Sequence, residues 1–304
     1  SLRNPRLVSP ERFSYIVTTL QSLLAVPRVS TRFAVLRILN KIAMVSPEKI
    51  AVCNAELETL INDSNRNIST YAITILLKTG NASNIASLIS RITRFIHDVS
   101  DDFKIIIIDA IRTLSLNFPQ EWKSIVKFLI DVLKNSEGGL KFKNTVVEAI
   151  IDIVSFIPDS KEMILESLCD FIEDCEFNEI LVRILHLLGK EGPYTSRPSL
   201  YVRHIYNRVV LENSIIRSAA VVALAKFALT KNDPTLKESI VSLLNRIAND
   251  QDDEVRDRAT IALRLIEFSE DDSTTVATEL IEPKYFYDLP SLEAKLNNYL
   301  NTND

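Results

Sequence analysis

Few side chains in this sequence have the types and spacing that catalysis or metal binding requires. The three histidines, His97, His186 and His204, form no H-x-x-x-H or H-E-x-x-H pair, in which two ring nitrogens on one helix face hold zinc. The acidic groups at 173–176 and 270–272 lack the alternating acids and the turn glycine of a calcium loop. No P-loop, G-x-S-x-G or G-x-G-x-x-G motif occurs. The sequence therefore predicts a protein that is not an enzyme and that needs neither a metal ion nor a cofactor.

The cysteines argue against a secreted protein held by disulfides. The chain has three cysteines, an odd number, at Cys53, Cys169 and Cys175. No two of them have the C-x-x-C spacing, and all three lie in stretches with a helical pattern. No apolar run approaches the roughly 18 residues that a membrane-spanning helix needs, and the amino end has no signal-peptide pattern. These features favour a reducing compartment, the cytosol or the nucleus.

The charge balance argues against nucleic acid as the main partner. The chain has 35 basic and 40 acidic residues and a net charge of −5, whereas a nucleic-acid groove usually shows a basic excess with stacking aromatics. Basic residues do gather in two places, which are Arg28, Arg32, Arg37 and Lys41, and Arg197, Arg203 and Arg208. We interpret both groups as exposed helix faces or protein contacts.

The stretch 252–263 shows the element that recurs along the chain. Asp253 is expected to cap a helix, because its carboxylate can accept a bond from an orphan amide of the first turn. One apolar stripe then follows at three- and four-residue spacing, formed by Val255, Ala259, Ala262, Leu263 and Ile266. Arg256, at the edge of this stripe, is expected to bond between neighbouring repeats, as are Arg217 and Asp253.

Positions equivalent to Ala259 recur at intervals of roughly 35 to 39 residues, a period typical of solenoids. They are Ala34, Ala72, Ile107, Val146, Leu181, Ala220 and Ala259. First helices fit between them at about 9–25, 46–62, 82–97, 119–135, 159–173, 199–211 and 234–249. The chain has only five glycines, two of them in a predicted loop at 189–199. The sequence therefore predicts an all-α fold, an α-solenoid of about seven HEAT- or armadillo-like helix pairs over residues 1–268.

Residues 269–304 depart from this period. An acidic, irregular stretch leads to the aromatic residues Tyr285, Phe286 and Tyr287, and a short helix is expected over 291–300. We expect this segment to pack on the last repeats, with contact to a separate partner as the alternative. Further contact residues are expected in one helix, namely Tyr206, Asn207, Arg208 and Glu212.

Ten blocks of the sequence closely resemble the gamma subunits of coatomer. They lie at 32–37, 39–44, 63–66, 76–80, 171–177, 183–189, 191–193, 205–212, 223–227 and 254–260. The likeness covers nearly the whole chain in order and at the right spacing, and only residues 270–289 depart from it.

The resemblance implies a structural subunit of the COPI vesicle coat, with an adaptin-like helical trunk of which this chain is the carboxyl-terminal half. It implies assembly with the zeta subunit and with the beta and delta subunits. It also implies recruitment by the GTPase Arf, whose main site is expected outside this stretch. The implied location is cytoplasmic and peripheral on Golgi membranes and COPI vesicles, in Golgi-to-ER retrograde and intra-Golgi transport.

Two other functions remain open on the residues alone. The first is an unrelated HEAT-repeat protein scaffold, such as a transport receptor or a phosphatase scaffold. The second, less favoured, is a solenoid that binds nucleic acid, for which affinity would fall steeply with salt.

Overall fold

Helices account for all the regular structure in the described part of the chain. The computed structural model describes residues 10–61, 63–79, 85–96, 99–135, 137–229 and 233–269. Within these ranges it contains fourteen α-helices in seven consecutive pairs, some preceded by a short 3-10 turn, and no strand. The chain divides into two compact units, Ser1–Ile180 and Leu181–Asp304.

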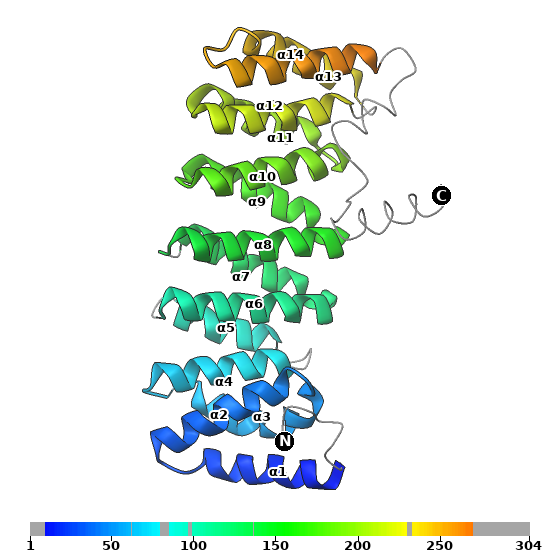
Figure 1. The fold of residues 1–304 in the computed structure, drawn as a ribbon. Helices are drawn as coiled ribbons and strands as arrows, with labels where there is room; N and C mark the ends of the chain where they lie inside the picture. The colour runs from blue at the N-terminus through cyan, green and yellow to red at the C-terminus, as the bar shows by residue number, and fades with distance from the viewer. Residues whose placement is uncertain are drawn as a thin grey trace, which may run out of the picture. The chain divides into compact units, whose positions relative to one another are not determined.

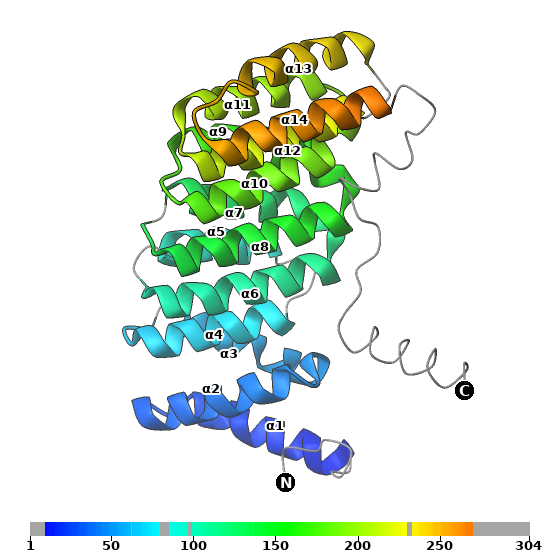
Figure 2. The ribbon, with the colours of Figure 1, turned by 45° about the horizontal axis from the view of Figure 1, so that its top comes forward.

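The first unit contains four helix pairs and the first helix of a fifth. Its helices are α1 (Pro10–Leu24), α2 (Val29–Ala43), α3 (Asn54–Leu60), α4 (Arg66–Thr79), α5 (Ile85–Phe95), α6 (Asp101–Asn117), α7 (Trp122–Asn135), α8 (Leu140–Phe156) and α9 (Lys161–Asp174). The second helices α2, α4, α6 and α8 contact one another in succession, as do the first helices α5, α7 and α9 (Figures 1 and 2). The unit is therefore a two-layered stack of helix pairs.

The second unit repeats this arrangement. It contains most of α10 (Asn178–Glu191), then α11 (Pro198–Leu211), α12 (Ser214–Leu229), α13 (Pro234–Ile247) and α14 (Asp253–Phe268). Helix α12 packs against α11, α13 and α14, so almost every face of it is covered. The predicted all-α, solenoid class with about seven helix pairs is confirmed.

Prolines and polar caps explain where the helices begin. Pro47, Pro119 and Pro158 each occupy the first position of a 3-10 turn that leads into a first helix. The cap of α14 is Asp252, and the prediction of Asp253 was wrong. Asp252 has an extended backbone and accepts bonds from the amides of the second and third helical residues at 3.1 and 3.3 Å, whereas Asp253 is already helical.

The predicted alignment was also wrong at Ala34. Ala34 is exposed, whereas the other six aligned residues are 0–1% exposed. In α2 the buried stripe starts one residue later and uses Val35, Leu36, Leu39, Ile42 and Ala43. Ala34 is followed directly by two apolar residues, Val35 and Leu36. Spacing along the sequence therefore could not decide which of the three faces the core.

The predicted loop at 189–199 is mostly helical. Helix α10 continues to Glu191, and a 3-10 turn over Gly192–Tyr194 follows, in which Gly192 and Pro193 are buried. Gly189 allows α10 and α12 to approach closely, since a β-carbon there would lie 2.8 Å from the Ala223 Cα. This glycine permits helix packing and does not mark a loop.

We expect Gly189→Ala to lower the free energy of unfolding by about 1–2 kcal/mol, since overpacking against backbone atoms outweighs the gain in helix propensity. Urea unfolding followed by circular dichroism measures this loss. For comparison, the methyl of Gly139→Ala would meet only Asp101 Oδ2 at 3.6 Å, and Gly139 is the N-cap of α8, so any loss there reflects capping and not a clash. Unchanged stability of Gly189→Ala would contradict the close approach of α10 and α12.

Candidate functional site

The contact residues predicted in α11 lie in different environments. Asn207 is exposed and Tyr206 is half-buried. Arg208 is only 8% exposed, and its guanidinium forms an ion pair with Glu212 one turn later at 2.7 Å. Arg208 is therefore not an exposed contact residue as predicted, because this pair holds it against the helix. Tyr285, Phe286 and Tyr287 lie outside the described residues.

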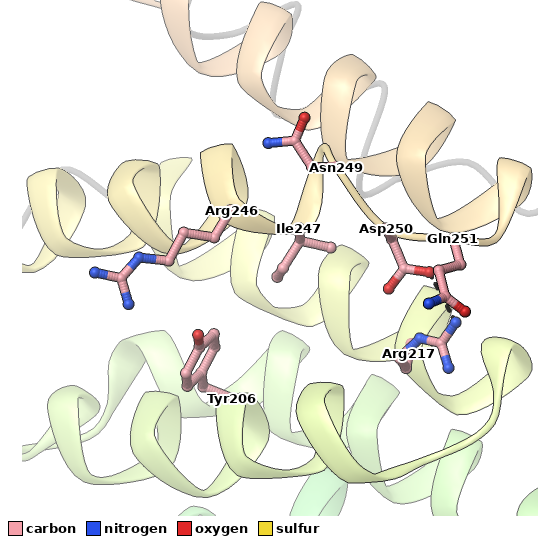
Figure 3. A pocket seen from close by; sticks show the side chains of 7 residues that line it. All are labelled: Tyr206, Arg217, Arg246, Ile247, Asn249, Asp250 and Gln251. Carbon is pink, nitrogen blue, oxygen red and sulfur yellow. Dashed lines mark hydrogen bonds and ion pairs between the residues drawn. The ribbon is translucent and has the colours of Figure 1, made fainter.

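Tyr206 lines a polar pocket at one edge of the second unit. The cavity, of about 340 Å³, is bounded by Tyr206 from α11, Arg217 from α12, Arg246 and Ile247 from α13, and Asn249, Asp250 and Gln251 from the turn that follows (Figure 3). Sequence reasoning missed Arg246, because no spacing along the chain indicates that α13 ends above α11. The pocket is formed jointly by the pair α11–α12 and by α13 with the turn that follows it.

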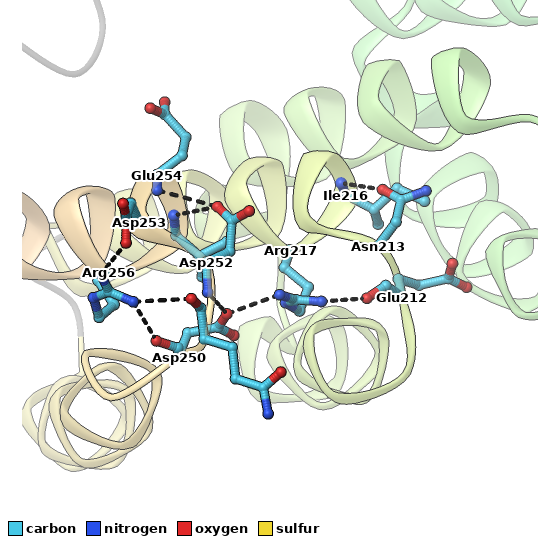
Figure 4. Close-up of polar contacts among 11 residues, drawn as sticks. Glu212, Asn213, Ile216, Arg217, Asp250, Asp252, Asp253, Glu254 and Arg256 are labelled. Atoms are coloured by element: carbon cyan, nitrogen blue, oxygen red, sulfur yellow. Dashed lines mark hydrogen bonds and ion pairs between the residues drawn. The ribbon is translucent and has the colours of Figure 1, made fainter.

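Arg217 connects the two pairs that form this pocket. One guanidinium nitrogen donates to the Glu212 carbonyl at 2.7 Å, in the turn before α12, and another pairs with Asp250 Oδ1 at 2.7 Å, in the turn before α14 (Figure 4). The side chains of Arg217 and Asp250 are 20% and 15% exposed. We call such a bond, from the fourth residue of a second helix to the turn of the next pair, a rung.

The rung also sets the protonation of Asp250. Burial alone would raise the pKa of its carboxyl. The hydrogen bonds from Arg217 and from the Asp252 amide, with the nearby charges of Arg217 and Arg256, lower this pKa below its ordinary value. Asp250 is thus held ionised beside the pocket at neutral pH.

Equivalent rungs occur in the first unit. Arg32, the fourth residue of α2, donates to the Val26 carbonyl at 2.8 Å and pairs with Asp63 at 3.1 Å. Lys104, the fourth residue of α6, donates to the Glu137 carbonyl at 2.8 Å. Lys143, the fourth residue of α8, lies 5.8 Å from the centres of the rings of Phe171 and Phe177, a cation–π arrangement.

Arg256 is the fourth residue of α14 but bonds within its own pair. It donates to the carbonyls of Asp250 and Gln251 at 2.9 and 3.0 Å and pairs with Asp253 (Figure 4). The side chains of Arg256 and Asp253 are 39% and 87% exposed. Arg256 and Asp253 were expected to bond to a neighbouring repeat. Within the described part of the chain they bond only inside their own pair, because no described pair follows α14.

Reactive groups do not converge in the described residues. No cluster there holds three or more potential metal ligands, and none of the described helices is long and apolar enough to cross a membrane. The thiols are buried. Burial, then the charge of Glu56, raises the pKa of Cys53 to about 11, and burial, then neighbouring carboxylates, raises that of Cys169 to about 12. Both thiols are therefore protonated and poorly nucleophilic at neutral pH.

Comparison with protein families gives one match, to the "Adaptin N terminal region", over residues 8–270. The coatomer subunit gamma of Saccharomyces cerevisiae is 77% identical over 99% of this chain. The probable coatomer subunit gamma of Schizosaccharomyces pombe and the coatomer subunit gamma of Arabidopsis thaliana are each 45% identical over 96% of it. The chain spans about a third of the length of these relatives, from 32% to 33%.

Structural comparison gives the same fold at low sequence identity. A homology model of the full-length AP-3 complex matches 97% of this chain and 58% of the matched chain, with a TM-score of 0.66 and 10% identity. The karyopherin Kap121p, in its complex with Ste12p, matches with a TM-score of 0.59 and 18% identity. The match covers 95% of this chain and 32% of the Kap121p chain. These likenesses concern the fold alone.

Loss of the Arg217 rung should destabilise the second unit more than loss of Arg256. Arg217→Ala leaves the partly buried Asp250 carboxylate without its charged partner, and we expect it to lower the free energy of unfolding by about 1–3 kcal/mol. Arg256→Ala removes a mostly exposed pair and should cost less than about 1 kcal/mol. Thermal and urea unfolding of both variants measure the difference.

A double-mutant cycle with Asp250→Ala is the control for this comparison. If Arg217 acts through Asp250, the double variant should lose less stability than the sum of the two single variants. Additive losses would show that Arg217 does not act through Asp250, and unchanged stability of Arg217→Ala would show that the rung does not stabilise the stack.

Proposed function

Because the chain belongs to the family of the adaptin N-terminal region, we propose that it is a structural segment of a coatomer gamma subunit, a scaffold in the COPI vesicle coat. The observation that carries the proposal is the 77% identity to the Saccharomyces cerevisiae gamma subunit over 99% of this chain. A solenoid without convergent reactive groups in its described part is suited to such a role. The chain acts by holding surfaces in place and performs no chemistry.

The geometry supports this mechanism in two ways. Apolar faces of successive helix pairs bury one another, so each pair fixes the position of the next within its unit. The rungs at Arg32, Lys104 and Arg217 add directional bonds between neighbouring turns. Such a stack presents its exposed side chains in a constant arrangement, which a coat needs if several subunits are to dock together.

We further propose the partners that the family resemblance implies. They are the zeta subunit and the beta and delta subunits, with Arf contacting the full-length subunit mainly outside this segment. We place the segment in the carboxyl-terminal half of the trunk. The assembled coat would be cytoplasmic and peripheral on Golgi membranes and COPI vesicles, in retrograde and intra-Golgi transport.

No observation favours the other functions. The likeness to Kap121p, at 18% identity, is a likeness of fold and carries no function with it. The chain is acidic overall, and Arg32 and Arg208, which belong to its two basic groups, are paired with Asp63 and Glu212. A transport receptor, a phosphatase scaffold and a nucleic-acid solenoid are therefore not proposed.

The segment 269–304, of which only Ser269 is described, is proposed to pack on the last pair. Helix α14 exposes Ile261 and Phe268, by 58% and 48%, together with part of Arg256. Packing of the segment at this position would cover these two exposed apolar side chains.

The coat function is tested by exchanging the matching segment of the Saccharomyces cerevisiae gamma subunit for this chain. We expect the tagged hybrid to co-purify with the zeta, beta and delta subunits in the same ratios as the parent subunit. Quantitative mass spectrometry of the purified coat measures these ratios.

The control is a hybrid that carries Leu224→Asp, a charge in the fully buried core of α12, which should not assemble because it should not fold. A hybrid that is folded, soluble and equally abundant but free of the other coat subunits would refute the proposed function.

The packing of the terminal segment is tested by deletion. Removal of residues 270–304 should speed amide hydrogen exchange in α14, because Ile261 and Phe268 would lose their cover. Exchange in α8, in the first unit, is the internal control. Unchanged exchange in α14 would contradict the packing.

A further inference from the structure

Three residues that line the polar pocket of the second unit have hydrogen-bond donors without a protein acceptor, and one of them, Arg246, is exposed to solvent. Tyr206 reaches it from α11 and Arg246 from the end of α13 (Figure 3). Among the described residues, neither the Tyr206 hydroxyl nor the Arg246 guanidinium has a hydrogen-bond or ion-pair partner. The Nε of Arg217 is buried and also lacks an acceptor there. Tyr206 and Arg246 lie together at one end of the pocket, and Arg217 lies with Asp250 at the other end (Figure 3).

The charge of the pocket points to a singly charged anion. Arg217 and Arg246 contribute two positive charges, and Asp250 contributes one negative charge that already binds Arg217. One positive charge remains. A doubly charged phosphate would face the Asp250 carboxylate, whereas a single carboxylate balances the excess. Guanidinium groups match the planar, two-oxygen geometry of a carboxylate well.

We propose that this pocket binds the side-chain carboxylate of an aspartate or glutamate in an extended acidic segment of a partner protein. The cavity of about 340 Å³ has room for such a side chain. Arg246 and the Tyr206 hydroxyl donate to the carboxylate, and buried Ile247 forms an apolar wall against its methylene groups. The assignment of the partner to the coat rests on the proposed function, but the binding chemistry does not.

The test uses the intact chain and the peptide acetyl-Gly-Asp-Glu-Asp-Gly-amide. Titration is followed through the Nε–H resonances of the arginine side chains. We expect a saturable shift at Arg246 and none at Arg264, whose side chain is 79% exposed on α14. The peptide with asparagine and glutamine in place of the acids should give no saturable shift.

Variants assign the binding to the pocket. Arg246→Gln should weaken the peptide affinity about tenfold, and Tyr206→Phe should weaken it several-fold, as expected for the loss of one charge-assisted bond and one hydroxyl bond. Arg264→Gln, the matched control, should change it by less than about twofold. Circular dichroism of each variant confirms that the helices are intact.

Equal affinity of the Arg246→Gln variant, or tighter binding of inorganic phosphate than of the peptide, would overturn the proposal. This outcome is separable from a failure of the coat function, because the titration needs no coat subunit. A hybrid that loses the coat while the chain still binds the peptide through Arg246 would refute the function and leave the pocket intact.

Discussion

The structure depends on one constraint, which is that a single pair of helices cannot bury its own apolar faces. Helix α12 shows this most clearly, since the consecutive residues Ala219, Ala220 and Val221, which point to different sides of the helix, are all buried. Its neighbours α11, α13 and α14 supply the cover. Because each pair is stabilised by the next, a unit tolerates polar loops and sparse capping, and its stability is distributed along the stack.

Apolar packing holds neighbouring pairs together, and the rungs add directional bonds at α2, α6, α8 and α12. Each begins at the fourth residue of a second helix, where a long basic side chain reaches the turn of the next pair. The partner differs, being a carboxylate for Arg32 and Arg217, a carbonyl for Lys104 and aromatic rings for Lys143. In these four helices the position of the cation is shared and the chemistry of its partner is not, whereas α4 and α10 have Ser69 and Leu181 at this position.

This explains what sequence could and could not predict. The repeat length, the all-α class and most of the first helices follow from the spacing of apolar residues along the chain. This spacing can be read directly from the sequence. The cap of α14 was misassigned by one residue because Asp252 and Asp253 are chemically equal and only backbone geometry separates them. The role of Gly189 depends on Ala223 of another helix, which no local pattern reveals.

The pocket lies beyond sequence reasoning for the same reason, and this gives it a property that a surface patch on one helix lacks. Its donors come from two successive pairs, α11–α12 and α13–α14, and the Arg217 rung fixes the distance between them. A carboxylate bound there contacts both pairs at once, so its affinity depends on the stack being intact. Docking at this edge would thus be coupled to the same interaction that holds the two pairs in register.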